Sequence, residues 1–392
     1  MRISFIVTTH DVAPYVGRCL DSLAGCVRPG DEVIVIDDGS SDRTDVLVQR
    51  RVAAGFGPGV AARALLLGAN TMGGVGIPAN IGLSHAAGEA VFFVDGDDWL
   101  ERDGFLACRA VFEATGPDIL IGNYLEHDEA TGAARLPFDR DRWAGLGAVR
   151  GDLAAERLVA VSMIGVPWRK FYRRDFLERS GIRFPEGDFF YEDNPFHWAI
   201  CRAAGSVGFV DRALCFHRVN RSGQTMAATG PELLAFFGHF ETICATIAPG
   251  DVVLRTAALE WLVGNMSWHV GRLQHGAFWD YAERAAGVLR DQTPYWPAIR
   301  HKYAGFAIGA MVEALMSGQI AATVAAWMAE RTLVSLAGVE QRVQQNIAWL
   351  QTRADAIAEQ SDRTHDRVQA ISLIAEFRAL QALHGTLPSD PP

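Results

Sequence analysis

Short apolar segments alternate with amphipathic ones over the first 100 residues, and this alternation most constrains the fold. The segment ISFIVTT (3–9) is followed by a helical pattern over 13–23 and then by DEVIVIDDGSSDRT, whose apolar run ends in Asp37 and Asp38. Apolar runs rich in β-branched residues predict buried strands. A strand, a helix and a second strand in this order predict a parallel sheet with right-handed crossovers. The sequence therefore predicts an α/β fold for the N-terminal part.

Acidic residues stand directly after two of the predicted strands. Two of them end the second strand, and three follow the apolar run at 91–94: Asp37, Asp38, Asp95, Asp97 and Asp98. Carboxylates this close together repel one another, so the second group is either a solvated turn or a site for a cation. Because ligands of parallel sheets bind beyond the carboxyl ends of the strands, both groups are expected to face one crevice.

Composition narrows the class of protein. The 392 residues carry a formal net charge of −10, and a surface that binds nucleic acid is usually basic, so no nucleic-acid partner is expected. The six cysteines show no CxxC spacing, which favours reduced residues of a cytosolic protein. The N-terminus lacks the long apolar stretch of a signal peptide, and the stretch 314–329 is too short and too broken to span a bilayer. A cytoplasmic location is therefore expected.

Five segments of the first 225 residues follow one another in a specific order: SFIVTTHDVAPYVGRCLDSL, VIVIDDGSSDRT, ANIGLSHAAGEAVFFVDGDDWL, PWRKFYRRDFLERSGIRFPEG and FYEDNPF. In order and spacing they resemble the successive motifs of family 2 glycosyltransferases. The resemblance implies a GT-A catalytic domain over residues 1–228, with the Rossmann-like mixed sheet of nucleotide-diphospho-sugar transferases.

The resemblance also implies a donor site. Thr8 and Asp38 match positions that contact the nucleotide base, and a carboxylate at Asp38 can accept the N3–H of uracil. Asp95 and Asp97 match the DxD motif, which contacts the donor ribose and holds Mg²⁺ or Mn²⁺ against the diphosphate. The implied metal ligands are Asp95, Asp97, Asp98 and His217. The implied nucleotide-sugar contacts are Thr8, Asp38, Asn80, Asp95, Arg218, Arg221 and Ser222.

Two loops are expected to border this donor site. A glycine-rich loop at 73–76 precedes a short helix that is expected to start at Asn80. The polar stretch after the last predicted strand resembles a loop that closes over the diphosphate. There Arg218 suits phosphate geometry. His217 either ligates the metal through a neutral ring nitrogen or packs at the end of the strand.

The stretch FYEDNPF carries a second acidic pair, Glu192 and Asp193. One interpretation is that both acids stabilise a helix N-terminus through the helix dipole. The resemblance implies instead that Asp193 is the catalytic base and that Glu192 supports it. An inverting transfer needs one carboxylate to take the acceptor hydroxyl proton, and it needs no covalent intermediate.

The remaining chain is helical in pattern. Residues 229–335 predict an all-α domain, and residues 336–384 predict one long helix. That helix places apolar or small residues at alternating spacings of four and three: Val343, Ile347, Leu350, Ala354, Ile357, Ser361, Thr364, Val368 and Ile371. Such a heptad seam favours a coiled coil that joins copies of the chain, and the alternative is a helix lying on its own catalytic domain. Residues 385–392 are expected to form a disordered tail.

Together these features predict an inverting, metal-dependent glycosyltransferase of surface polysaccharide or glycoconjugate synthesis. The expected donor is a UDP-sugar, and the expected acceptor is a hydroxyl of a glycan, a glycolipid or a protein-linked chain. Peripheral contact with the inner face of the membrane is a further expectation, which the mixed charges of the helical domain weaken. Two alternatives are a sugar nucleotidyltransferase and a non-catalytic oligomeric scaffold. A nucleotidyltransferase is expected to carry a glycine- and Lys/Arg-rich phosphate loop near its N-terminus, and this sequence has none there. The intact acidic pairs disfavour a non-catalytic scaffold.

Overall fold

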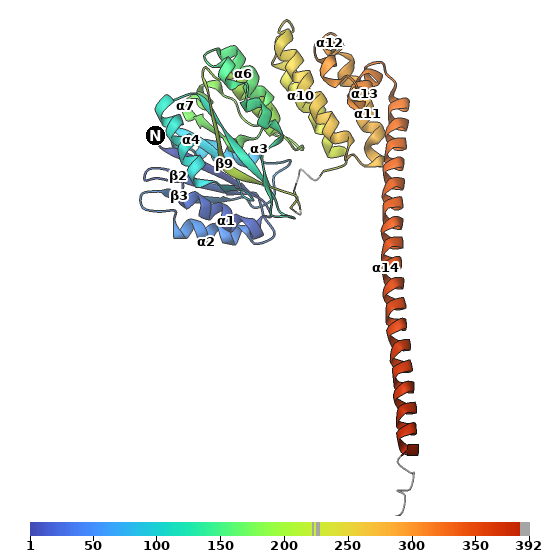
Figure 1. Cartoon of the computed structure of the whole chain (residues 1–392). Helices are drawn as coiled ribbons and strands as arrows, with labels where there is room; N and C mark the ends of the chain where they lie inside the picture. The colour runs from blue at the N-terminus through green and yellow to red at the C-terminus, as the bar shows by residue number, and fades with distance from the viewer. Residues whose placement is uncertain (222, 225–227, 385–392) are drawn as a thin grey trace, which may run out of the picture. The chain divides into compact units, whose positions relative to one another are not determined.

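The computed structural model describes residues 1–221, 223–224 and 228–384, so the predicted tail at 385–392 lies outside the described residues. The described residues form a nine-stranded mixed sheet (Figure 1). Its strands are β1 (Ile3–Thr9), β2 (Glu32–Asp37), β3 (Ala61–Leu66), β4 (Ala90–Asp95), β5 (Trp99–Leu100), β6 (Ile119–Asp128), β7 (Ala134–Arg135), β8 (Lys170–Arg173) and β9 (Val207–Val219). They lie in the order β3-β2-β1-β4-β8-β6-β9-β5, and β7 pairs with β6. The predicted α/β fold with a mixed sheet is confirmed.

Strand β1 lies between β2 and β4 and runs parallel to both. In this register Thr9 lies opposite Asp37, and Thr8 lies opposite Asp95. Every residue of β1 and β2 is buried, as expected for parallel strands that are covered on both faces. The acidic residues appear where β2 and β4 end, so they share one edge of the sheet as predicted.

Helices cover both faces of the sheet. They are α1 (Ala13–Ala24), α2 (Thr44–Ala54), α3 (Gly76–His85), α4 (Arg102–Thr115), α5 (Leu146–Val149), α6 (Leu153–Ser162), α7 (Arg174–Ser180) and α8 (Asp193–Ala203). On one face, Leu20 of α1 and Phe105 of α4 pack with Phe5 of β1 in one hydrophobic core. On the opposite face, α3 approaches β1 so closely that a Cβ at Gly82 would lie 2.3 Å from Ile6 Cγ2. The glycine therefore lets α3 lie against the sheet.

A group of helices follows the sheet. These are α9 (Ala235–Ala245), α10 (Val252–Val270), α11 (Phe278–Arg290), α12 (Trp296–Ile299) and α13 (Ala307–Met316), as predicted for an all-α segment. Helix α9 packs against α8, and α10 packs against α6. Met1–Val324 form one compact unit, so the sheet and these helices share a continuous set of contacts.

The C-terminal helix α14 spans Ile320–His384 and therefore begins well before the predicted residue 336. No proline interrupts this stretch, which explains the earlier start. Five apolar residues of the predicted seam are between 43% and 67% exposed: Val343, Ile347, Leu350, Val368 and Ile371. The side chains of Ala354 and Ile357, also predicted for the seam, lie outside the described set. These five side chains of the seam are therefore largely exposed.

Part of α14 also meets the length and composition of a membrane span. The segment Ile320–Arg353 is long and apolar enough to cross a bilayer, and 18% of its apolar window is buried. This segment is longer than the stretch 314–329 that the sequence pattern singles out, because Leu333, Val334 and Leu336 continue the apolar composition. Glu330 and Arg331 stand in its middle.

Candidate active site

The edge of the sheet beyond β1 and β4 carries the candidate active site. Asp95 is the last residue of β4, and a tight turn follows in which Asp98 N donates to Asp95 O at 3.0 Å. Gly96 N donates to Thr8 O at 2.9 Å, and a Cβ at Gly96 would lie 2.6 Å from Thr9 Cγ2. The turn therefore requires glycine between its acids and holds them against the end of β1.

The three carboxylates of this turn converge. One oxygen from each of Asp95, Asp97 and Asp98 lies within 4.8 Å of the others. Burial, together with the charges of Asp98 and Asp97, raises the pKa of the Asp95 carboxyl well above its usual range. Among the described residues, none donates a hydrogen bond to this carboxylate. The site therefore concentrates negative charge that a cation would stabilise.

Asp98 is held by residues at the end of β9. Its Oδ2 lies 2.9 Å from His217 Nδ1, and its Oδ1 accepts from Arg218 N at 2.7 Å. Burial alone would lower the pKa of His217, but the charge of Asp98 and the hydrogen bond to it outweigh burial and raise the pKa to about 9. The His217 ring also stacks on Trp168, with centroids 4.8 Å apart. The structure thus brings His217 to the acidic cluster as the partner of Asp98.

Two arginines predicted to contact the donor also lie at the cluster. Arg218 Nε donates to Asp97 O at 2.9 Å, and Arg221 Nε donates to Asp97 Oδ2. The Arg218 guanidinium lies over the rings of Tyr15 and Trp99, at 4.5 and 4.9 Å from their centroids. The predicted contact Ser222 lies outside the described residues. Both arginines are therefore placed to offset the charge of a diphosphate beside the acids.

The predicted base-binding residues, Thr8 and Asp38, lie at the same edge of the sheet, at the ends of β1 and β2. Thr8 is buried at the end of β1, directly opposite Asp95. Asp38 follows β2, and its two carboxylate oxygens accept from Thr71 N at 2.9 Å and Thr71 Oγ1 at 2.8 Å. These bonds orient the carboxylate while leaving further lone pairs for a donor N–H group.

Asn80 lies inside helix α3 rather than at its start. Helix α3 starts at Gly76 rather than at Asn80, and Pro78 suits its first turn. Asn80 Nδ2 donates to Phe184 O at 2.9 Å, and Asn80 Oδ1 accepts from Phe184 N at 3.0 Å. The amide thus joins α3 to the segment that leads to α8, and its contact with the donor stays a prediction.

The second acidic pair begins α8, as predicted. Glu192 is 2% exposed, and its Oε1 accepts from Gly76 N at 2.6 Å. Burial raises the pKa of Asp193 to about 7; the charge of Glu192 adds to this rise, and Lys170 opposes it. A carboxylate with a pKa near 7 suits a general base at neutral pH. Glu192, by contrast, is occupied in holding the glycine-rich loop.

Some residues at this site are not among the predicted site residues. Tyr15, Trp99 and Glu129 surround the Arg218 guanidinium, and Glu129 Oε2 accepts from its Nη1. They come from α1, β5 and the turn after β6, so only the folded sheet brings them together. Lys170 is another such residue: it is fully buried on β8, and its charge acts on Asp193. Its spacing in the sequence does not reveal this role.

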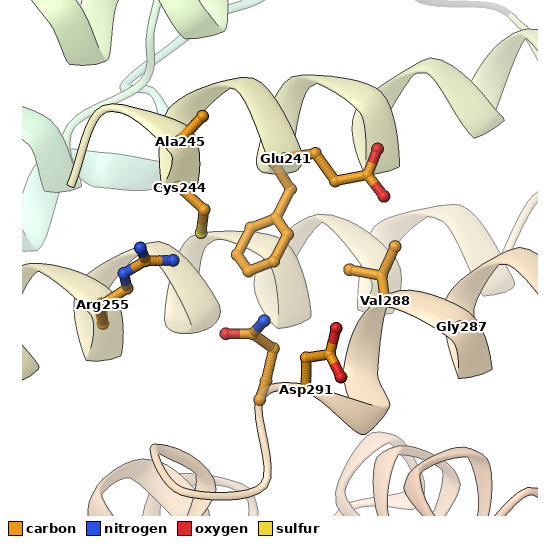
Figure 2. A pocket seen from close by; sticks show the side chains of 9 residues that line it. Glu241, Cys244, Ala245, Arg255, Gly287, Val288 and Asp291 are labelled. Carbon is orange, nitrogen blue, oxygen red and sulfur yellow. The ribbon is translucent and has the colours of Figure 1, made fainter. Parts of the chain in front are cut away.

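A hollow of about 210 Å³ lies among α9, α10 and α11. Figure 2 shows Glu241, Cys244, Arg255 and Asp291 around it. Its lining residues, all within the described chain, include none of the predicted site residues. The acidic cluster at the sheet edge therefore remains the candidate active site.

Comparisons with known proteins agree with this geometry. Residues 4–181 match the family model for glycosyl transferase family 2. Glycosyltransferase EpsJ of Bacillus subtilis is 26% identical over 275 residues, which cover 67% of this chain and 77% of EpsJ. Poly(ribitol-phosphate) β-N-acetylglucosaminyltransferase TarS of Staphylococcus aureus is 25% identical over 254 residues, which cover 64% of this chain but only 41% of TarS.

Solved structures share the fold. The crystal structure of S. aureus TarS 1–349 in complex with UDP-GlcNAc aligns with a TM-score of 0.64 at 20% identity, over 85% of this chain and 92% of that one. A mannosyltransferase from Pyrobaculum calidifontis, in complex with GDP-Man and Mn²⁺, aligns with a TM-score of 0.51 at 19% identity, over 84% and 86% of the two chains. The predicted GT-A fold is therefore confirmed, and the chain carries a glycosyltransferase domain of family 2 that matches at residues 4–181.

Proposed function

We propose that this protein is an inverting, metal-dependent enzyme that transfers a sugar from UDP to a hydroxyl group of a surface glycan or glycoconjugate. The observation that carries the proposal is the arrangement at one sheet edge: the acidic cluster, the base-binding positions and the arginines lie together there. TarS 1–349, which shares the fold, was crystallised in complex with UDP-GlcNAc, and this supports UDP as the nucleotide here. TarS is named for poly(ribitol-phosphate), a polymer of sugar-like units, which supports a polymeric acceptor.

The acidic cluster fits a divalent cation. Three carboxylates with convergent oxygens, one of them without a hydrogen-bond donor among the described residues, offer the hard ligands that Mg²⁺ and Mn²⁺ prefer. In this proposal Asp95 and Asp97 hold the cation, and His217 and the Arg218 backbone hold Asp98 in place beside them. When bound, the cation supplies charge stabilisation for the nucleoside diphosphate that departs.

Asp193 is the proposed base. It starts α8 and has a pKa of about 7, so near neutral pH a large fraction of it is ionised while it remains basic enough to accept a proton. In the proposed reaction the acceptor hydroxyl attacks the anomeric carbon, Asp193 takes its proton, and the bond to UDP breaks. One carboxylate suffices because each transfer is a single displacement with inversion.

Titration calorimetry with UDP, in Mn²⁺ and in EDTA, tests the metal. We expect UDP to bind the wild-type protein only with the cation, and Asp97→Ala to remove this dependence because a ligand is lost. Asp280→Ala, at an exposed site on α11, is the matched control and should bind like the wild type. Equal affinity of the wild type for UDP in Mn²⁺ and in EDTA would refute the metal-dependent mechanism.

We further propose that α14 joins copies of the chain. The seam from Val343 to Ile371 repeats spacings of four and three, and its described apolar side chains are exposed. Glu330, Arg331 and Glu340 interrupt the apolar segment Ile320–Arg353, which favours a coiled coil over a bilayer span.

We also propose a cytoplasmic location, with peripheral contact at the inner face of the membrane. The six free, buried cysteines are consistent with a reducing compartment.

A further inference from the structure

The segment that leads into α8 is held from two sides. On the donor side, Gly74 N donates to Phe189 O at 3.1 Å, and Gly76 N donates to Glu192 Oε1 at 2.6 Å. On the side of the helical segment, His239 of α9 places Nε2 2.7 Å from Phe190 O. The residues immediately before the proposed base are therefore fixed between the glycine-rich loop and α9.

The backbone in this segment adopts a conformation that needs support. Tyr191 has φ +67°, in the left-handed region that non-glycine residues rarely occupy. Its carbonyl accepts from Asn194 N and Asn194 Nδ2, both at 3.1 Å, so the turn passes directly into the first turn of α8. A rotation of the backbone at Tyr191 would move Asp193, two residues further on. The direction of the base thus depends on what keeps this turn in place.

Helix α9 supplies contacts on both residues before the acidic pair. The His239 side chain is 4% exposed and its ring lies 5.1 Å from the ring of Phe189. Phe236, one turn earlier on α9, packs on Tyr191 with centroids 4.6 Å apart. Burial lowers the pKa of His239, so the neutral ring donates its Nε2–H to the Phe190 carbonyl. The helix therefore holds the carbonyl before the left-handed residue and the side chain of that residue.

We propose that His239 is a positioning residue for sugar transfer: its hydrogen bond to Phe190, aided by Phe236 on Tyr191, keeps the left-handed turn that directs Asp193 at the acceptor. The inference rests on the proposed role of Asp193 as base. It gives the helical segment a part in the chemistry, because His239 and Phe236 come from α9, outside the family domain at residues 4–181.

Three variants of the full-length chain test this role. His239→Leu removes the donor, and His239→Gln restores an N–H group near the position of Nε2. Phe237→Leu is the control: Phe237 is buried on the same helix but packs on Tyr281 of α11, 4.9 Å between centroids. The control loses core packing between α9 and α11 and keeps both His239 and Phe236.

Hydrolysis of UDP-GlcNAc with Mn²⁺, with water as acceptor, provides kcat and KM. We expect His239→Leu to lower kcat roughly 10- to 100-fold, the scale of a misplaced catalytic group, with KM within about twofold of the wild type. His239→Gln should recover most of the loss, and Phe237→Leu should keep kcat even where its melting temperature falls. Amide exchange at residues 189–194 should rise in His239→Leu alone.

Two results would overturn the inference: wild-type kcat in His239→Leu, or equal losses of kcat in His239→Leu and Phe237→Leu without recovery in His239→Gln. Unchanged amide exchange at 189–194 in His239→Leu would do so even without an active donor. Asp193→Asn in the same assay separates this failure from that of the proposed function. Normal turnover in that variant refutes the base itself, whereas a slow Asp193→Asn beside a fully active His239→Leu refutes only the positioning.

Discussion

The sheet edge and the helix α14 place their apolar residues in opposite ways. In β1 and β2 every residue is buried, and polar side chains appear only near the two ends of each strand. In α14 the described apolar residues of the seam are at least 43% exposed. Burying an apolar side chain stabilises a fold by about 1.5–3 kcal/mol, so the sheet satisfies within one chain a requirement that α14 does not. The comparison separates a region whose apolar side chains are buried within the chain from one whose described apolar seam residues are exposed.

If the sheet edge and α14 act independently, substitutions at the sheet edge should alter turnover and leave the oligomeric state unchanged. Substitutions on α14 should alter the oligomeric state and leave turnover unchanged. The following experiments test this separation, from the largest expected effect on turnover to the smallest.

Replacing the proposed base should have the largest effect. Asp193→Asn is nearly isosteric, so α8 should keep its start, but the amide cannot accept the acceptor proton. We expect turnover to fall by on the order of 10²–10⁴-fold, the usual contribution of a general base, with UDP–Mn²⁺ affinity and oligomeric state unchanged. Steady-state kinetics and calorimetry check both parts. Loss of UDP–Mn²⁺ binding in this variant would move Asp193 from the acceptor to the metal.

Glu192→Gln provides the comparison within the pair. Its Oε1 already accepts from Gly76 N, and a glutamine oxygen can accept the same bond. We therefore expect a smaller loss of turnover than in Asp193→Asn. A loss of equal size would mean that the charge of Glu192, rather than its hydrogen bond, takes part in the reaction.

How much of each region the sequence predicts depends on how far apart in the sequence its contacting residues lie. Asp95 and Asp97 were predictable because the apolar run that precedes them determines a strand, and the strand determines where its end lies. The bond of Asp98 to His217 joins residues 119 positions apart, and that of His239 to Phe190 joins residues 49 apart. No local periodicity encodes such contacts. Asn80 illustrates the same limit: its bonds to Phe184 depend on how the segment before α8 returns to α3.

Lys170 should affect turnover by changing the pKa of Asp193, so its effect should depend on pH. It is fully buried, and its Nζ donates to Val166 O. Burial raises the pKa of Asp193 to about 7, and the charge of Lys170 opposes this rise. Burial also lowers the pKa of Lys170 itself to about 7, so its ammonium group loses its charge over the same pH range. The ionised base is the active form, so turnover should rise as pH increases through about 7. Below about pH 7 Lys170 is charged and opposes the protonation of Asp193, so Lys170→Met should raise the pKa of Asp193 and move the acid side of this limb to higher pH.

A pH–rate profile of donor hydrolysis measures the shift. Tyr172→Phe, two residues along β8, is the control because it changes no charge, although its hydroxyl donates to Pro167 O. We expect its profile to match that of the wild type. A limb that stays in place in Lys170→Met would show that the two side chains are not coupled electrostatically.

Charges placed in the α14 seam should affect turnover least. Val343 and Leu350 are seven residues apart on the seam, and both are exposed in the single chain. In a coiled coil they would be buried against a partner, where aspartates are costly without compensating partners. The full-length double variant Val343→Asp/Leu350→Asp should therefore reduce the oligomeric state seen by light scattering, with donor hydrolysis within about twofold of the wild type, as expected for surface changes away from a site.

The matched control places the same two charges off the seam. Gln345 and Thr352 lie two residues after Val343 and Leu350, on the solvent face of the proposed coil. Gln345→Asp/Thr352→Asp adds the same charge to the same two turns, so any general effect on helix stability should appear in both variants. If both lose the oligomer equally, the cause is helix stability and the seam is not the interface. If the wild type is monomeric at micromolar concentration, the seam does not join two copies of the chain. If only the seam variant dissociates and its turnover also collapses, the two regions are coupled after all, and the active site depends on the assembly.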